Sequence, residues 1–157
     1  MDNLDYGIIG NCRSAALVSK TGSIDWCCLP EFDSPSVFAK LLDEEIGGSF
    51  EINVDATYNI SQKYEPFTNI LITSFKSGEN HFEIHDFMEE KLYHAPPELI
   101  RYFKHISGTP EFSITYDPKL EYAIGKTESF IKKDFVASLT HDVKFDTIFL
   151  YSSLVFK

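Results

Sequence analysis

The sequence has little positive charge, and it has no long apolar run. Fourteen Lys and Arg residues stand against 24 Asp and Glu residues, which gives a formal net charge of −10. Nucleic-acid binding depends on Lys and Arg clustered at phosphates, so this balance argues against DNA or RNA as a partner. The longest apolar stretches, such as 148–151, are far shorter than the roughly 20 residues that span a bilayer. We therefore expect a soluble acidic domain that is not inserted in a membrane.

Signals for export, disulfide formation and nucleotide binding are also missing. The first five residues contain neither the basic nor the apolar part of a secretory signal, so we expect a cytoplasmic protein. Cys27 and Cys28 are neighbours on a predicted strand and point to opposite faces, and Cys12 has no obvious partner. Free thiols are the usual state in a reducing compartment. No glycine-rich phosphate loop and no Gly-x-Ser-x-Gly motif occur, and no cofactor is expected.

Aromatic residues, by contrast, are abundant. They make up 15% of the chain and include 14 Phe and 8 Tyr spread along its whole length. Such a composition argues against disorder and favours strands, where aromatic side chains pack well. A chain of 157 residues is long enough for one domain with a real core.

Short alternating segments predict an antiparallel β-sandwich, similar to a supersandwich. Residues 14–18 and 23–28 read as a hairpin, with Gly22 at a turn position that needs a positive φ. Turn signals then recur about every ten residues, which is typical of a sandwich. The further predicted strands are 50–54, 70–75, 81–88, 99–106, 111–116, 129–132, 135–139 and 147–155.

One helix is expected in this β-rich chain, near 36–43. Ser34 is a plausible N-cap and Pro35 suits the first helical position. The apolar residues that follow recur at helical spacing, and Gly47-Gly48 would end the element. These apolar residues are Val37, Phe38, Leu41 and Leu42.

Neither a metal site nor a catalytic carboxylate pair can be derived from the pattern. His81, Glu83 and His85 share one face of a predicted strand, but the two histidines are about 13 Å apart, too far for one zinc ion. A solvent-facing or edge-strand position is the better interpretation. The acidic runs 43–45 and 89–90 look like solvated charge rather than a hydrolase pair.

The best candidate surface lies in the loops around Asn11, Arg13, Asp25, Trp26 and Asp33. Sugar sites combine an aromatic face with carboxylates and amides that bond to hydroxyl groups, and Trp26 is the only tryptophan. In the competing interpretation, Trp26 is core, and the two aspartates cap turns or pair with Arg13.

A third interpretation makes the same region a seam against another domain. The seam would include Phe32 between Pro30 and Pro35, together with Val37 and Phe38, unless these side chains are core. A lone domain with such a seam exposed is expected to self-associate.

Two stretches resemble the trehalase-like N-terminal domain of glycoside hydrolase family 15, the glucoamylase/trehalase-like proteins. They are Ile-Ile-Gly-Asn-Cys-Arg-Ser-Ala-Ala-Leu-Val at 8–18, and Gly-Ser-Ile-Asp-Trp-Cys-Cys-Leu-Pro at 22–30 continuing through 32–39. Weaker similarity follows at 86–88, 106–108 and 116–118. The sequence departs from the family pattern at Cys12, where Gly is usual, at Glu31, where a basic residue is common, and at Glu89, where Pro is usual.

The resemblance implies a function only for a longer protein. Members of the family cleave α-glucosidic bonds with inversion, and they carry a β-sandwich in front of a helical (α/α)6 barrel that holds two catalytic glutamates. Residues 1–157 contain no such barrel, so no catalytic residue is carried over. We expect one non-catalytic domain of a larger α-glucoside hydrolase, with the barrel as its partner. The alternative is a self-standing module that binds an α-glucoside sugar.

Overall fold

The computed structural model describes residues 5–90, 95–141 and 146–153, and it is built almost entirely of strands. Only a short 3-10 turn, η1 (Glu121–Ala123), interrupts them within these ranges. All the strand pairs are antiparallel. The strands are β1 (Tyr6–Gly10), β2 (Ala15–Ser19), β3 (Ile24–Cys28), β4 (Ser36–Phe38), β5 (Ser49–Asn53), β6 (Asn59–Tyr64), β7 (Leu71–Ser77), β8 (Asn80–Met88), β9 (Leu99–Ser107), β10 (Ser113–Asp117), β11 (Thr127–Ile131), β12 (Phe135–Thr140) and β13 (Asp146–Tyr151).

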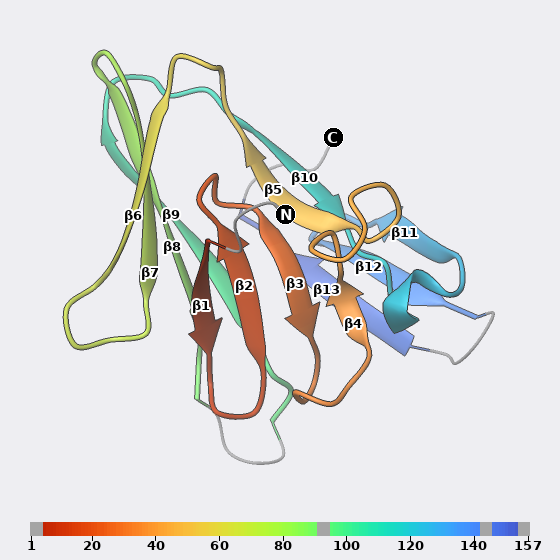
Figure 1. Ribbon diagram of the computed structural model, residues 1–157. Coiled ribbons are helices and arrows are strands. Elements are labelled where there is room, and N and C mark those ends of the chain that lie inside the picture. The colour runs from red at the N-terminus through yellow and green to blue at the C-terminus, as the bar shows by residue number, and fades with distance from the viewer. Residues whose placement is uncertain (1–4, 91–94, 142–145, 154–157) are drawn as a thin grey trace.

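The strands form three sheets in two layers. Sheet A has the order β1-β2-β3-β5-β10, with β4 paired to β3. Sheet B has the order β6-β7-β8-β9, and sheet C has the order β11-β12-β13. Figure 1 shows sheet A as the front layer, with sheet B behind one side of it and sheet C behind the other. The predicted antiparallel β-sandwich is therefore confirmed.

Two apolar clusters fill the space between the layers. The first joins residues of sheet A, such as Ile9 and Val18, to Leu71 and Met88 of sheet B, and Ile148 and Leu150 of sheet C pack against it. The second is aromatic. In it Phe75 and Phe82 stack with their ring centroids 4.6 Å apart and are fully buried. The first cluster thus joins inward-facing residues of all three sheets.

The hairpin predicted around Gly22 forms as β2 and β3. Gly22 has a φ of 81°, a conformation that glycine adopts without steric cost. The other predicted strands also form, although β13 spans 146–151 and residues 154–155 of that prediction lie outside the described ranges. Strands β1, β4 and β6 were not anticipated.

The helix predicted near 36–43 is wrong. Residues 36–38 pair with β3 as strand β4, where Cys27 lies opposite Phe38. Val37 and Phe38 are only 4% and 3% exposed, so both side chains are part of the sandwich core. The segment after them is closed by backbone bonds from Ala39 N–H to the Gly47 carbonyl (2.8 Å) and from Lys40 N–H to the Gly48 carbonyl (3.1 Å). Burial of both faces by neighbouring strands overrides the local helical spacing.

A buried ion pair joins the layers. Arg101 of β9 lies opposite Asp86 of β8, and its Nε is 2.8 Å from the Asp86 Oδ1. The guanidinium also donates to the backbone carbonyls of Phe50 (2.7 Å) and Gly22 in sheet A, and it lies 4.8 Å from the centre of the Phe50 ring. The two side chains are 6% and 0% exposed.

The outer edge of sheet A is closed by sheet B. The backbone N–H of Ile8 in β1 donates to the Tyr64 hydroxyl at 2.8 Å, and that hydroxyl lies 2.9 Å from the Ile8 carbonyl. The Asn69 side-chain amide donates to the Gly10 carbonyl at 2.5 Å. An edge strand has backbone N–H and carbonyl groups without a neighbouring strand to bind them. On β1, the side chains of Tyr64 and Asn69 form hydrogen bonds with such groups of Ile8 and Gly10.

Candidate functional site

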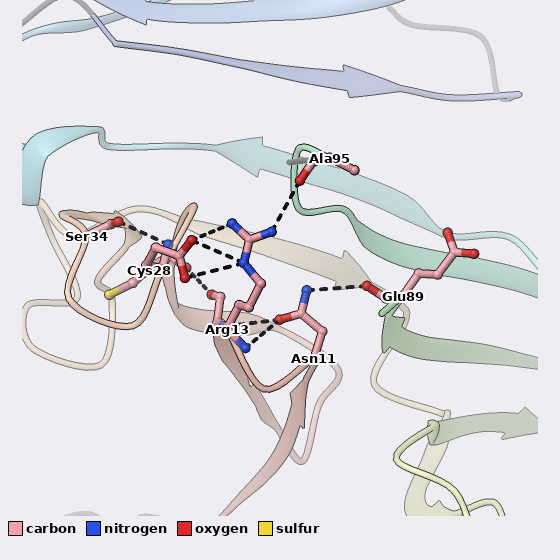
Figure 2. A network of polar contacts seen from close by, with 8 residues as sticks. Asn11, Arg13, Cys28, Ser34, Glu89 and Ala95 are labelled. Carbon is pink, nitrogen blue, oxygen red and sulfur yellow. Dashed lines mark hydrogen bonds and ion pairs between the residues drawn. The ribbon is translucent and has the colours of Figure 1, made fainter. Parts of the chain in front are cut away.

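Three loops meet at one end of the sandwich, and we call this region the loop end. It consists of the β1–β2 turn (11–14), the β3–β4 loop (29–35) and the described parts of the β8–β9 connection (89–90 and 95–98). Asn11 and Arg13 of the first loop point toward Glu89 and Ala95 of the third in Figure 2. These loops contain four of the six residues that the sequence singled out.

Asn11 fastens its own turn and then reaches across to the third loop. It is 8% exposed, and its Oδ1 accepts from the backbone N–H groups of Arg13 (3.1 Å) and Ser14 (3.0 Å). Its Nδ2 donates to the Glu89 carbonyl at 3.3 Å. A buried side-chain amide with this many partners stabilises the shape of the turn.

Arg13 joins all three loops. Its Nε donates to the Glu31 carboxylate at 3.1 Å, its Nη1 donates to the Ala95 carbonyl at 3.4 Å, and its backbone carbonyl accepts from the Phe32 N–H at 2.8 Å. A second guanidinium nitrogen also contacts Glu31, so the ion pair is two-pronged. The partner is thus Glu31 rather than either predicted aspartate. In the sequence, Glu31 stands out only as a departure from the family pattern, and local spacing does not mark it as the partner of Arg13.

Asp25 lies away from the loop end, within sheet A. Leu17 lies opposite Trp26 and Val18 lies opposite Ile24, so Asp25 is the extra residue of a β-bulge in β3. Its side chain is 6% exposed and accepts from the hydroxyls of Tyr6 (3.0 Å) and Ser23. Burial, together with the bond to Asp25, raises the pKa of the Tyr6 phenol to about 12.

Trp26 lies on the outer face of sheet A and is half-buried. Its register neighbour is Leu17, and Leu17 lies opposite Ile8 on the edge strand, which is 57% exposed. Alternate residues of a strand point to opposite faces, so these three side chains form an apolar row on the face away from the core. Trp26 is therefore neither fully core nor part of the loop end.

Phe32 and Asp33 lie at the tip of the β3–β4 loop, and both are exposed. Phe32 is 61% exposed and Pro30 is also exposed, as the seam interpretation requires. Val37 and Phe38 do not belong to that surface, because they are core.

The predicted row His81, Glu83 and His85 does share one face of β8, but the predicted edge-strand position is wrong, because β8 lies between β7 and β9 and the side chains of Glu83 and His85 are only 15% and 18% exposed. Nε2 of His85 lies 2.9 Å from the Glu83 carboxylate, whereas His81 bonds to Ser74 at 2.9 Å. Burial favours the neutral acid, but the bond from His85 and the charge of Lys104 outweigh it and lower the pKa of Glu83. Within the described ranges, no group of three His, Cys, Asp or Glu residues is arranged to hold a metal ion.

The cysteines behave as expected from their positions. Cys27 and Cys28 are buried free thiols, and Cys12 is an exposed one. Burial raises the pKa of the Cys27 thiol to about 12, so it stays protonated at neutral pH. Neither buried thiol is placed as a nucleophile.

Among the grooves lined by described residues, two lie away from the loop end. The larger, about 430 Å³, lies between β1 and β6 and is lined by residues that include Tyr6, Gln62 and Tyr64. The smaller, about 200 Å³, lies beside Lys40 and Glu51, whose side chains form an ion pair at 2.6 Å. Neither groove is lined by Asn11, Arg13, Trp26, Phe32 or Asp33. Within the described residues, no helix is long and apolar enough to cross a membrane.

Comparison with known proteins identifies the family. The model of the family described as trehalase-like, N-terminal matches residues 5–144. The trehalase of Thermoplasma volcanium is 37% identical over 134 residues, which is 82% of this chain and 21% of that protein. Trehalase 2 of Sulfolobus acidocaldarius is 33% identical over 131 residues, 83% of this chain and 21% of that protein. Trehalase 1 of the same organism is 48% identical over 83 residues, 52% of this chain and 14% of that protein.

The match covers nearly all of this chain but little of each relative. The chain spans about a fifth of the length of the first two trehalases. No solved structure matches it significantly. The family match extends over most of the chain and over strands β1 to β12, including the loop end. The chain therefore belongs to the trehalase-like N-terminal domain family.

Proposed function

We propose that this chain is the non-catalytic N-terminal sandwich of a trehalase-like α-glucoside hydrolase of the glycoside hydrolase family 15 type. In this role it packs against the helical catalytic part of the longer protein and helps to shape the mouth of its active site. The observation that carries the proposal is the family match over 5–144, together with relatives named trehalase in which the matched segment is only 21% of the protein.

The bonds of two of the three buried carboxylates among the described residues support a non-catalytic role, and the third, Glu121, has an Oε1 atom without a hydrogen-bond partner. Asp25 accepts hydrogen bonds from Tyr6 and Ser23, and Asp86 is ion-paired with Arg101 inside the core. An inverting glycosidase needs an acid and a base that face each other across a water molecule and a sugar. These two carboxylates are instead occupied by structural donors.

The loop end supports a role as a rigid platform. Arg13 ties three loops together, and the exposed Phe32 and Asp33 project from the middle one. Loops held on a rigid scaffold are the usual place for recognition surfaces. In this proposal Asn11 and Arg13 position the loop end, while Phe32 and Asp33 contact the partner domain or its sugar.

Asp25 and Trp26 have a different part in the proposal. Asp25 holds the bulge of β3, and the bulge sets the direction of Trp26 on the outer face of sheet A. Trp26 then offers a half-exposed aromatic surface that is independent of the loop end.

Hydrolysis assays test the non-catalytic role. The purified chain is incubated with trehalose and, separately, with maltooligosaccharides, and glucose release is measured against a blank. We expect no release. Glucose release that a single Asp or Glu substitution in this chain abolishes would contradict the proposal.

A chimera tests the domain role. In it, this chain replaces the matched segment of the Thermoplasma volcanium trehalase, which is 37% identical. We expect the chimera to hydrolyse trehalose. A second chimera with Arg13→Ala should lose part of this activity, because the three loops are no longer tied, whereas the matched control Lys104→Ala on the outer face of sheet B should not. Equal activity of both variants would remove the loop end from the proposal.

A further inference from the structure

Sheet C carries an aromatic face that no other described part of the chain covers. The inner face of sheet C packs against the core. Val136 on this face is 6% exposed, and Ile148 and Leu150 contact the first apolar cluster. The opposite face carries Phe130, Phe135, Phe149 and Tyr151, and we call these four residues the aromatic face.

The strand register brings the four rings together. Phe130 lies opposite Ala137, and Ala137 lies opposite Phe149, so one row crosses all three strands. Phe135 lies opposite Tyr151 in the next row, and its ring centroid is 5.7 Å from that of Phe149 and 5.6 Å from that of Tyr151. Phe135, Phe149 and Tyr151 therefore form one cluster of rings in contact, and Phe130 lies on the same face, separated from Phe149 by Ala137.

The exposed area of the aromatic face is comparable with one side of a small interface between domains. Phe130, Phe149 and Tyr151 are 44%, 52% and 70% exposed. A fully buried aromatic ring removes about 150–250 Å² from water, so these three leave on the order of 300 Å² uncovered. Interfaces between domains of one chain bury about 600–1,500 Å² in total, and half of that lies on each side. The exposed area of these three rings thus equals what one side of the smallest such interfaces buries.

The border of the face is polar. Lys132, Lys133 and Asp134 form the exposed turn between β11 and β12, and at the other end Lys126 and Glu128 form an ion pair at 2.8 Å. An apolar centre with a charged rim is the composition of an interface between folded surfaces. On the outer face of sheet A, by contrast, the apolar row Ile8, Leu17 and Trp26 contains a single aromatic ring.

We infer that the aromatic face is the surface on which the remainder of a trehalase-like polypeptide packs. The occupant follows from the relatives, in which the matched segment is 21% of the protein and some four-fifths of the polypeptide lies outside it. Domains of one chain commonly share an interface, and the aromatic face offers the largest cluster of exposed rings among the described residues. The inference rests on the proposed function and names its contact surface.

Hydroxyl-radical footprinting tests the inference in the active chimera described above. The oxidation rates of Phe149 and Tyr151 are compared between the isolated chain and the chimera. Phe67, which is fully exposed on the β6–β7 loop, is the internal control, and Phe32 reports on the loop end. We expect the rates of Phe149 and Tyr151 to fall severalfold in the chimera while the rate of Phe67 stays unchanged.

The outcomes separate the inference from the proposed function. An active chimera in which Phe149 and Tyr151 react as fast as in the isolated chain overturns the inference and leaves the function intact. Protection of Phe32 alone assigns the contact to the loop end, which also overturns it. Phe149 and Tyr151 could instead be protected already in the isolated chain and lose this protection on dilution. That result identifies a second copy of the chain as the occupant, and it also overturns the inference. An inactive chimera counts against the proposed function.

A second measurement uses the isolated chain only. The double variant Phe149→Thr and Tyr151→Thr should unfold within about 2 °C of the parent chain, because both rings face water. The control Val136→Thr, on the buried side of the same sheet, should lower the midpoint clearly. A double variant that loses as much as the control would show that the rings belong to the core of this chain, and the inference would fail.

Discussion

At the scale of single residues, the departures from the family pattern have clear physical consequences. Cys12 takes the place where glycine is usual, and its φ is 66°, in the left-handed region that favours glycine. Its side chain is exposed, so it contributes no packing in return. Glu31, where a basic residue is common, forms the ion pair with Arg13. Cysteine at position 12 therefore costs conformational energy, whereas glutamate at position 31 supplies an ion pair.

The substitution Cys12→Gly should stabilise the domain. Relief of the left-handed strain is worth about 1–2 kcal/mol, and the greater freedom of glycine in the unfolded chain takes back part of it, which leaves about 0.5–1 kcal/mol. Urea denaturation measures the change in the free energy of unfolding. Cys12→Ala is the control, since it removes the thiol but keeps the strain. Equal stabilisation by both variants would show that the thiol, not the backbone, is responsible.

Tyr6 should make the stability of the domain depend on pH in the alkaline range. Its pKa is raised from 10 to about 12 by burial and by the bond to Asp25, so the folded state holds a proton that the unfolded chain releases. Stability from this group is complete below pH 10 and is lost as the pH rises toward 12.

Comparing Tyr6→Phe with the parent chain isolates this contribution, because Cys27 titrates in the same range in both proteins. The measurement is the denaturation midpoint at several pH values from about 9 to 12. The variant should lose less stability over this interval than the parent. Identical pH profiles would mean that the bond to Asp25 does not hold the phenol proton.

At the scale of elements, Tyr64 of β6 makes two of the bonds that close the edge of β1. The Tyr64 hydroxyl binds both the N–H and the carbonyl of Ile8. Because β1 is the first strand of sheet A, those groups have no strand beside them. The contact fastens the edge and joins the two layers at the same place.

Tyr64→Phe should therefore destabilise the domain by about 1 kcal/mol, the typical net value of a hydrogen bond. It should also speed amide hydrogen exchange at Ile8. Tyr102→Phe, at an exposed position of β9, is the control and should change neither. Unchanged exchange at Ile8 in Tyr64→Phe would show that water replaces the hydroxyl without loss.

At the scale of the whole molecule, one ion pair connects the layers of the sandwich. Asp86 and Arg101 both belong to sheet B, yet the guanidinium bonds to the carbonyls of Phe50 and Gly22 in sheet A. Both charges are removed from water, so each depends on the other.

Asp86→Asn should lower the free energy of unfolding by about 3–5 kcal/mol, because it leaves the Arg101 charge buried without its counterion. The double variant Asp86→Leu with Arg101→Met should recover part of the loss but not all, since the carbonyls of Phe50 and Gly22 then lack their donor. Chemical denaturation of the two variants and the parent chain measures both effects. A loss below about 1 kcal/mol in Asp86→Asn would mean that the pair is solvated.

The sequence by itself determined the fold class and most of the strands. Alternation of apolar and polar residues is a local property, and so is the turn preference of Gly22, so both could be read directly. The stretches 8–18 and 22–39 also sufficed for the family. The helix at 36–43 failed because its apolar spacing suits two structures, and only pairing with β3 and burial of Val37 and Phe38 decided between them.

Only the tertiary structure decided the partners of charged and polar side chains. Arg13 lies 18 residues from Glu31, and Arg101 lies 15 from Asp86 and 51 from Phe50, and nothing in local spacing selects these pairs. The aromatic face likewise depends on strand register, because a shift of one residue would have turned Phe149 and Tyr151 into the core. Local patterns specify which elements can form. Which side chains meet, and which face is left uncovered, is set by how the sheets pack together.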